Sequence, residues 1–304
     1  MCQGLSVKLI CLPKRVASRT LWIASLTPIR AASLIIKIMI RTWKILKNTR
    51  KEIKFSDQSS LDAITRQLPE GYYSTFRTFD GCTRVLGLPT HLQRLPDIDA
   101  SSLRRNLTQL LEPYRPDEVR VRVMKTIKGQ VYVSIEPLNL LLREVYENGV
   151  HVETTEIRRE SPRLKSTAFI GQSQDARSYI AKSKVFEALL IKKGIVLEGM
   201  TSNFFYVVNN VLFTAQRDIL LGVTRRNVIR VARKMGVKVV YRPLNLDQIS
   251  AVSEAFITSS SRGIVPVVQI NDDVIGAGIP GEKTQMLMFA YENYVLGAAE
   301  KIEV

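Results

Sequence analysis

An alternating stretch near the middle of the chain constrains the fold more than any other feature. Residues 119–123 alternate valine with arginine, and residues 131–135 place valine or isoleucine at every second position after a Lys128-Gly129 turn. Because successive side chains of a strand point to opposite faces, this pattern predicts two antiparallel strands with one buried face. Arg120 and Arg122 share the other face, which either lines a cleft or faces solvent.

Similar signals precede this hairpin. The aromatic segment Tyr72 to Phe79 ends at an Asp80-Gly81 turn, which predicts a second hairpin. Residues 101–111 carry leucines at helical spacing, so we expect a helix there with a serine cap. These elements predict a small α+β domain at 51–138, followed by an interdomain linker at 139–147.

The remainder of the chain, 148–304, predicts a second and larger domain of mixed strands and helices. It shows no internal repeat and no low-complexity tract. The segments expected to form strands are Val152–Ile157, Ile195–Leu197, Asn203–Val208, Val237–Tyr241 and Ala255–Thr258, and the expected helices are Ile180–Leu190, Thr224–Met235 and Thr284–Ala299.

The positive charge is concentrated at the N-terminus. The chain has 44 basic and 28 acidic residues, but residues 1–51 hold eleven of the basic residues and no acid. Three interpretations of residues 1–50 stay open: a transit peptide, a solvated basic arm, and sequence upstream of a true start at Met39. We favour the third and exclude 1–50 from the predicted fold. The rest of the chain carries 33 basic against 28 acidic residues, which argues against a nucleic-acid binder.

Other residue types exclude several classes of site. The longest apolar stretch of the leader, Ala31 to Ile40, is interrupted by Lys37 and is too short to cross a bilayer. Three scattered cysteines and two histidines argue against a disulfide framework, a metal site and a Ser-His-Asp triad. The expectation is a cytoplasmic protein without metal and without a membrane partner.

Two polar turns of the larger domain could bind an anion. Gly222 to Arg225 opens an amphipathic helix, where free N–H groups attract anions, although simple capping by Thr224 explains the threonine as well. Thr258 to Gly263 is rich in hydroxyl groups after an apolar strand. Together the turns favour a phosphorylated cofactor. Gly276 to Gly281 matches G-x-G-x-x-G but lies near the C-terminus, so we interpret it as a turn before the last helix.

The order of several motifs resembles that of the class IV aminotransferases, which are pyridoxal-phosphate enzymes of fold type IV and include branched-chain and D-amino-acid aminotransferases. The similarity covers about residues 70–297. It rests on Lys165, on His91-x-x-Arg94-Leu95, on Glu198-Gly199 followed by Ser202-Asn203-Phe204, and on segments 221–225, 254–260 with Pro266, and 275–281. The resemblance implies a two-domain α+β and α/β fold whose larger, cofactor-binding domain carries a barrel-like sheet.

The resemblance also implies roles for nine residues. Lys165 would bind pyridoxal 5'-phosphate covalently and carry the proton of the substrate α-carbon, as a lysine of lowered pKa can. Glu198 would pair with the ring nitrogen. The phosphate would be bound by Arg94, Val223, Thr224 and Ser260, and the substrate by Tyr73, Arg122 and Ser261.

The implied activity is transamination between an amino acid and a 2-oxo acid by a homodimer. Ile170 stands where branched-chain enzymes carry a tyrosine, and Ser202 replaces a glutamate, so the donor stays open between branched-chain and D-amino acids. An aminodeoxychorismate lyase is the alternative within the family. A non-catalytic protein that binds through the basic arm is the alternative from another class.

Overall fold

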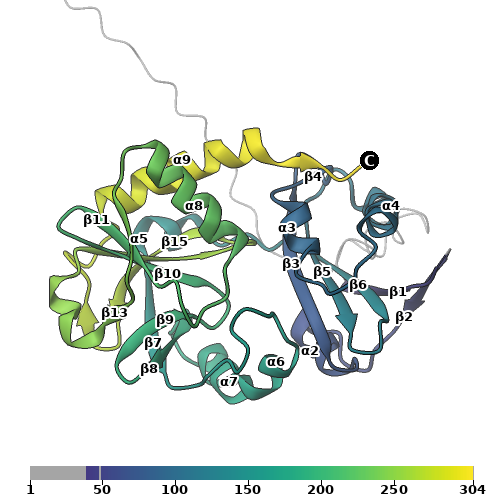
Figure 1. Cartoon of the computed structure of the whole chain (residues 1–304), viewed down its shortest axis with the longest axis horizontal. Coiled ribbons are helices and arrows are strands. Elements are labelled where there is room, and N and C mark those ends of the chain that lie inside the picture. The colour runs from purple at the N-terminus through teal and green to yellow at the C-terminus, as the bar shows by residue number, and fades with distance from the viewer. Residues whose placement is uncertain (1–38, 48, 304) are drawn as a thin grey trace, which may run out of the picture.

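The computed structural model describes residues 39–47 and 49–303, so the interpretations of the leader fall largely outside the described residues. Two bodies lie side by side (Figure 1), and each is built around its own sheet. The mixed architecture and its division into two sheet-based parts match the predicted fold class.

The smaller body contains an antiparallel sheet of seven strands in the order β17-β4-β3-β5-β6-β1-β2. Both predicted hairpins are confirmed, as β3 with β4 and β5 with β6. The helix predicted at 101–111 is present as α4, but its cap is Asp99, whose side chain accepts from the Ser102 amide. The elements are β1 (Arg41–Ile45), β2 (Arg50–Ile53), α2 (Leu61–Arg66), β3 (Gly71–Phe79), β4 (Arg84–Val85), α3 (Leu88–Leu92), α4 (Ala100–Leu111), a 3-10 turn at Glu112–Tyr114, β5 (Val119–Thr126), β6 (Val131–Pro137) and β17 (Glu300–Lys301).

Both ends of the described chain contribute to this sheet, which corrects the predicted boundaries. β1 pairs with β6 from Arg41↔Ile135 to Ile45↔Val131, and Trp43 is buried in the core of the small domain. The exclusion of 1–50 from the fold is therefore wrong for Arg41–Ile45 and for Arg50, the first residue of β2. β17 pairs with β4, and Ile302 joins the same core. Residues 300–302 therefore belong to the small domain and not to the larger one. These contacts are between strands distant in sequence, which periodicity cannot reveal.

The larger body contains a mixed sheet of ten strands. Its order is β12-β11-β10-β14-β15-β7-β8-β9-β13, with β16 paired to β15. β9 and β10 are joined by the short turn Met200–Ser202 but stand far apart in this order, so the sheet must curl to bring them together. The strands are β7 (Val150–Thr155), β8 (Glu187–Lys192), β9 (Ile195–Gly199), β10 (Asn203–Val208), β11 (Val211–Thr214), β12 (Val239–Tyr241), β13 (Leu244–Asn245), β14 (Glu254–Ser259), β15 (Gly263–Ile270) and β16 (Asp273–Val274).

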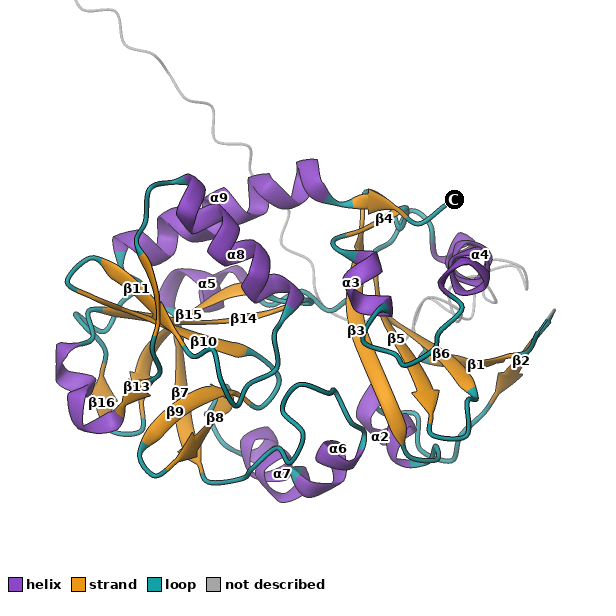
Figure 2. Ribbon diagram, in the orientation of Figure 1, coloured by secondary structure: helices purple, strands orange, loops and turns teal. Residues whose placement is uncertain are grey.

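Helices cover the curled sheet (Figure 2). α8 and α9 share one apolar cluster with β10 and β14, which includes Phe205, Val228 and Leu287. The helices are α5 (Arg143–Asn148), α6 (Ala168–Gln172), α7 (Gln174–Lys182), α8 (Val223–Lys234), a 3-10 segment at Leu246–Ala251, and α9 (Glu282–Ala298).

The prediction of a helix over Ile180–Leu190 is wrong. α7 ends at Lys182, and residues from Glu187 onward form β8. β8 is buried along four successive residues, because the sheet is covered on both faces there. A short apolar strand of this kind has no alternation that distinguishes it from a buried helix. The glycine-rich segment 276–281 does form the turn before α9, as predicted.

Candidate active site

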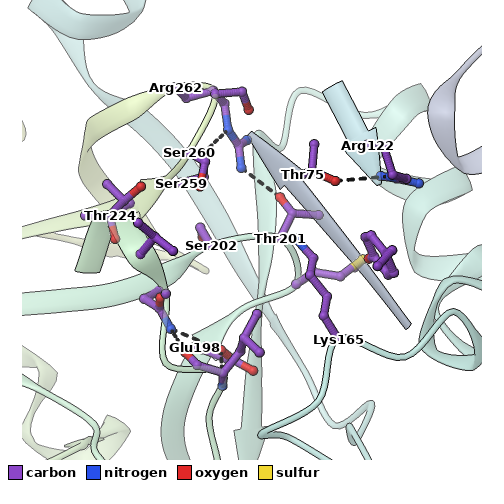
Figure 3. Close-up of a pocket in the computed structure, with 18 of the residues that line it drawn as sticks. Thr75, Arg122, Lys165, Glu198, Thr201, Ser202, Thr224, Ser259, Ser260 and Arg262 are labelled. Atoms are coloured by element: carbon purple, nitrogen blue, oxygen red, sulfur yellow. Dashed lines mark hydrogen bonds between the residues drawn. The ribbon is translucent and has the colours of Figure 1, made fainter. Parts of the chain in front are cut away.

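A cavity of about 290 Å³ lies between the two domains. The structure brings all nine predicted site residues to its wall. They come from the small domain and the large domain alike, and Figure 3 shows Lys165, Glu198, Thr224 and Ser260 arranged around this one space. The nine are Tyr73, Arg94, Arg122, Lys165, Glu198, Val223, Thr224, Ser260 and Ser261.

The main chain at Lys165 is attached to the start of β3. The Tyr73 amide donates to the Lys165 carbonyl at 2.9 Å, and the Thr167 amide donates to the Gly71 carbonyl at 2.9 Å. The Thr167 hydroxyl accepts from the Gly71 amide at 3.0 Å. On its other side, a Cβ at Gly71 would lie 2.2 Å from the Lys125 carbonyl oxygen of β5, so the close packing of β3 on β5 at this position requires glycine. A loop of the large domain is thus fixed to a strand of the small one.

The side chain of Lys165 lies among cations. Its Nζ is 4.9 Å from the centre of the Tyr73 ring. Burial, together with the charges of Arg94, Arg122 and Arg159, lowers the pKa of Lys165 well below its ordinary value. A lowered pKa increases the share of neutral amine at a given pH, and the neutral amine is the form that attacks a carbonyl or accepts a proton.

Glu198 lies one residue before the end of β9, at the opposite wall, and three donors surround it. Its carboxylate accepts from Arg159 Nε at 3.2 Å, from Asn203 Nδ2 at 3.1 Å and from the Leu220 amide at 3.0 Å. Only 2% of Glu198 is exposed, and this burial raises its pKa to about 7 against the lowering effect of Arg159. The charge of Lys165 also lowers the pKa of Glu198, as expected for two groups facing one space.

The first turn of α8 forms the third side of the cavity. Its N-cap is Gly222 and no side chain caps it, so the interpretation of Thr224 as the cap is wrong. Val223 and Thr224 belong to the first turn, whose N–H groups have no intrahelical partner. A Cβ at Gly222 would lie 2.1 Å from Asn203 Oδ1. The absence of a side chain at Gly222 therefore allows this turn to lie close to β10.

Arg94 and the turn after β14 lie at the same end of the cavity as the first turn of α8, and they add further groups that can bind an anion. Arg94 donates to the Leu221 carbonyl just before α8. Burial lowers the pKa of Arg94 to about 10, which leaves the guanidinium charged at neutral pH. Ser260 lines the cavity from the turn between β14 and β15. A helix start, a guanidinium and a hydroxyl are groups that together bind phosphate.

Arg122 occupies the end of the cavity formed by the small domain. Only 7% of it is exposed, so its face of the sheet lines the cleft and not the solvent. Its guanidinium lies 4.5 Å from the Tyr73 ring and donates to Asp62 at 2.7 Å and to Thr75 at 3.1 Å. Arg177 of α7 donates to the other oxygen of Asp62 at 2.7 Å. One carboxylate therefore holds two guanidinium groups across the domain boundary.

Sequence reasoning missed the residues that support this site. Arg159, Asp62, Arg177 and Arg262 line the cavity, and Asn203 lies within a recognised motif but received no role. Arg262 donates to the buried Glu187 at 2.8 Å and so holds the turn after β14. A signal existed for Asn203, which lies five residues after Glu198, and for Arg262, which lies in the hydroxyl-rich turn 258–263, whereas Arg159 and Arg177 stand in segments without a pattern.

Several buried polar groups of the cavity wall lack a hydrogen-bond partner among the described residues. The Ser202 and Thr258 hydroxyls and Arg159 Nη1 are buried, and none of them has a hydrogen-bond partner among the described residues. Buried polar groups of this kind are rare unless water or a ligand satisfies them. The wall therefore fits a polar molecule with a phosphate group at α8 and an acceptor near Arg159. Within residues 39–47 and 49–303, no acidic, cysteine and histidine side chains gather as metal ligands.

Comparison with known proteins is consistent across sequence and structure. Residues 71–270 match the model of the amino-transferase class IV family. D-alanine aminotransferase of Bacillus licheniformis is 33% identical over 122 residues, which cover 40% of this chain and 43% of that relative. Aminodeoxychorismate lyase of Bacillus subtilis is 26% identical, covering 74% of this chain and 85% of the relative. A Thermotoga maritima structure assigned to the branched-chain amino acid aminotransferases aligns with a TM-score of 0.71 at 27% identity, covering 84% of this chain and 96% of the other.

No helix among the described residues is both long and apolar enough to pass through a bilayer.

Proposed function

The chain belongs to the class IV aminotransferases, and from this premise we propose that it transfers an amino group from an amino acid to a 2-oxo acid with pyridoxal 5'-phosphate as cofactor. The observation that carries the proposal is that Lys165, Glu198 and the uncapped first turn of α8 line the same cavity. Two unpaired hydroxyls on the same wall support a polar cofactor.

The residues present would hold the cofactor at three points. Arg94, the first turn of α8 and Ser260 would bind the phosphate, Glu198 would pair with the ring nitrogen, and Lys165 would be the point of covalent attachment. Bound pyridoxal phosphate supplies an electron sink for the negative charge that develops at the substrate α-carbon.

The protein itself would move the proton and orient the substrate. Lys165 Nζ, whose pKa is lowered by burial and by its cationic neighbours, would accept the α-proton and return it. Arg159 and the Leu220 amide would keep Glu198 ionised against its burial. Tyr73, Arg122 and Ser261 would bind the substrate, with Arg122 offering a guanidinium to a carboxylate.

The amino donor is proposed as a branched-chain or a D-amino acid, because relatives of both kinds are similar to the chain. Elimination of pyruvate from an aminated chorismate derivative is the second candidate, supported by the similarity to the Bacillus subtilis lyase. A panel of L- and D-amino acids and aminodeoxychorismate, each supplied with and without 2-oxoglutarate, separates them. A transaminase consumes the oxo acid in proportion to the donor, whereas a lyase releases pyruvate without any acceptor.

We also propose that the enzyme works as a homodimer in the cytoplasm. The dimer follows from the family resemblance, and α9 exposes large apolar side chains, with Phe289 70% and Leu296 77% exposed, that a second subunit could cover. The cytoplasm is favoured by the free, buried thiol of Cys82. Lys165 and Glu198 both line the cavity, and their presence argues against the alternative of a non-catalytic binding protein.

A further inference from the structure

A second concave site lies on the outer side of α8. This groove has a volume of about 570 Å³ and is lined by Arg225, Arg226, Arg230, Arg233, Lys234 and Tyr241, among others. Its volume is within the range of about 300 to 1,000 Å³ typical of small-molecule sites. Gly222 is the residue it shares with the cavity of the active site, so a ligand here would be distinct from the cofactor and the substrate.

The groove gathers five cations without an acid. Arg230 donates to the neutral partners Asn227 and Tyr294, and Arg233 donates to the Tyr241 hydroxyl. No aspartate or glutamate of the described chain lines the groove. Elsewhere in the protein most partly buried arginines are paired, as Arg159 is with Glu198. Like charges held close together disfavour one another, and a bound anion relieves that repulsion.

Arg225 forms the buried part of this cationic cluster. Only 4% of it is exposed, and it donates from Nη2 to the Ala215 carbonyl at 2.6 Å and to Gln216 at 2.9 Å. Its Nη1 makes no hydrogen bond to any described residue. The Nη1 atom is not one of the buried donors that lack a partner, so it is open to the groove. A ligand in the groove can therefore reach one donor of this guanidinium.

The spacing of the exposed arginines indicates how many charges the ligand carries. Arg226, Arg230 and Arg233 follow the four- and three-residue intervals that place side chains on one helix face. At 1.5 Å per residue they extend over about 10 Å of the axis. A single phosphate cannot contact both ends of such a row, so the ligand must carry more than one anionic group.

The depth of the groove favours a small ligand over a nucleic-acid strand. Arg225 lies within the wall while Arg226, Arg233 and Lys234 are exposed at the rim. A strand laid across the surface would contact the rim, whereas a compact phosphate group can enter and reach Arg225. We propose that this groove is a binding site for a small molecule that carries two or more phosphate groups, either as inorganic polyphosphate or as a nucleoside polyphosphate.

Calorimetric titration of tripolyphosphate and of ATP into the protein tests the proposal. The protein is first saturated with pyridoxal phosphate and reduced with borohydride, so that added anions cannot occupy the cofactor site. We expect saturable binding of at least one of the two probes with one site per chain. Tighter binding of ATP would identify a nucleotide as the source of the phosphates, and equal binding an inorganic polyphosphate.

Two double variants make the test specific. Arg226→Gln/Lys234→Gln removes two exposed charges of the groove that make no hydrogen bond or ion pair with the described residues, and binding should weaken tenfold or more. Arg105→Gln/Lys128→Gln removes two exposed charges from the small domain and should change binding less than twofold. Absence of saturable binding at millimolar probe, equal weakening in both double variants, or tighter binding of a single-stranded oligonucleotide that the groove variant abolishes would overturn the proposal.

Discussion

The Lys165 carbonyl accepts a hydrogen bond from the Tyr73 amide at 2.9 Å, while the Lys165 Nζ lies 4.9 Å from the centre of the ring of the same tyrosine. β3 of the small domain thus positions both the backbone and the amine of a lysine that belongs to the large domain. The Arg122 guanidinium also lies over the Tyr73 ring, with its Cζ 4.5 Å from the ring centre. The candidate site therefore depends on both domains being in place.

Removing the ring of Tyr73 should impair the site more than removing its hydroxyl. The contact of the Arg122 cation with the ring is worth about 0.5 to 2 kcal/mol, and the ring also packs against the Lys165 amine, so Tyr73→Ala should lower kcat/KM about tenfold or more. Tyr73→Phe keeps the ring and should stay within a few fold of the wild type. Steady-state kinetics with one donor and acceptor pair compare the two variants. An equal loss in both would assign the role to the hydroxyl and contradict the ring contacts.

Asp62 should stabilise the folded protein in a manner that depends on pH. Burial opposes its charge, but Arg122 and Arg177 prevail and lower the pKa of Asp62 from 3.8 to about 2. An acid whose pKa is lowered on folding adds stability above its unfolded pKa and loses it as the pH falls through the folded value. Asp62→Asn should therefore cost about 2 kcal/mol at pH 7.

Urea unfolding of the wild type and of Asp62→Asn measures this contribution. The difference between their free energies of unfolding should shrink as the pH falls from about 4 towards 2. Glu52→Gln is a suitable comparison, because Glu52 pairs with Arg41 at the surface of the small domain and its side chain is 38% exposed. An exposed pair contributes little. A difference for Asp62→Asn that stays constant with pH would contradict the ion pairs as its cause.

Arg159 should set the acid limit of activity. It donates to Glu198 at 3.2 Å and lowers the pKa of that buried carboxyl, and it also lowers the pKa of Lys165. In Arg159→Met both pKa values should rise, so the acid limb of the profile of kcat/KM against pH should move to higher pH. The same profile for Arg163→Met, an exposed neighbour in sequence, should be unchanged. A loss of activity that is uniform in pH would show that Arg159 acts only through packing.

Two truncations should distinguish the leader from the fold. Deletion of residues 1–38 removes no strand of the described sheet, and activity and the melting temperature should be retained. Deletion of residues 1–50 removes β1, with Trp43 buried to 7% exposure and a full pairing with β6. We expect that protein to be unfolded or to melt much earlier in a circular dichroism scan. Normal melting of the longer deletion would show that β1 is dispensable.

The local patterns predicted elements well where one face of a strand or helix is buried. The Val119–Val123 alternation became β5, and the stripe on residues 224–235 became α8. β8 was mistaken for a helix because both of its faces are buried. The contributions of β1 and β17 to the small sheet depend on pairing across the length of the chain, which no local pattern encodes.

Sequence motifs predicted the residues of the candidate site, but they did not predict the residues that hold those side chains in place. Ordered short motifs predicted the nine residues that meet at the cavity, because seven of them stand in a loop, in a turn, near a strand end or at a helix start with a recognisable local sequence. Tyr73 and Arg122 lie within predicted strands. Arg159 and Asp62 act through partners far away in the chain, Glu198 and Arg122. Single charged residues without a neighbouring pattern reveal such partners only when the fold is known.

The covalent attachment of the cofactor to Lys165 is the central claim, and one measurement tests it directly. The protein is incubated with pyridoxal phosphate, reduced with borohydride, digested and analysed by mass spectrometry, with Lys165→Ala treated in parallel. We predict that the cofactor mass is fixed on the peptide containing Lys165 and is absent from the variant. Specific labelling of a different lysine, or no specific labelling of the folded wild-type protein, would contradict the account.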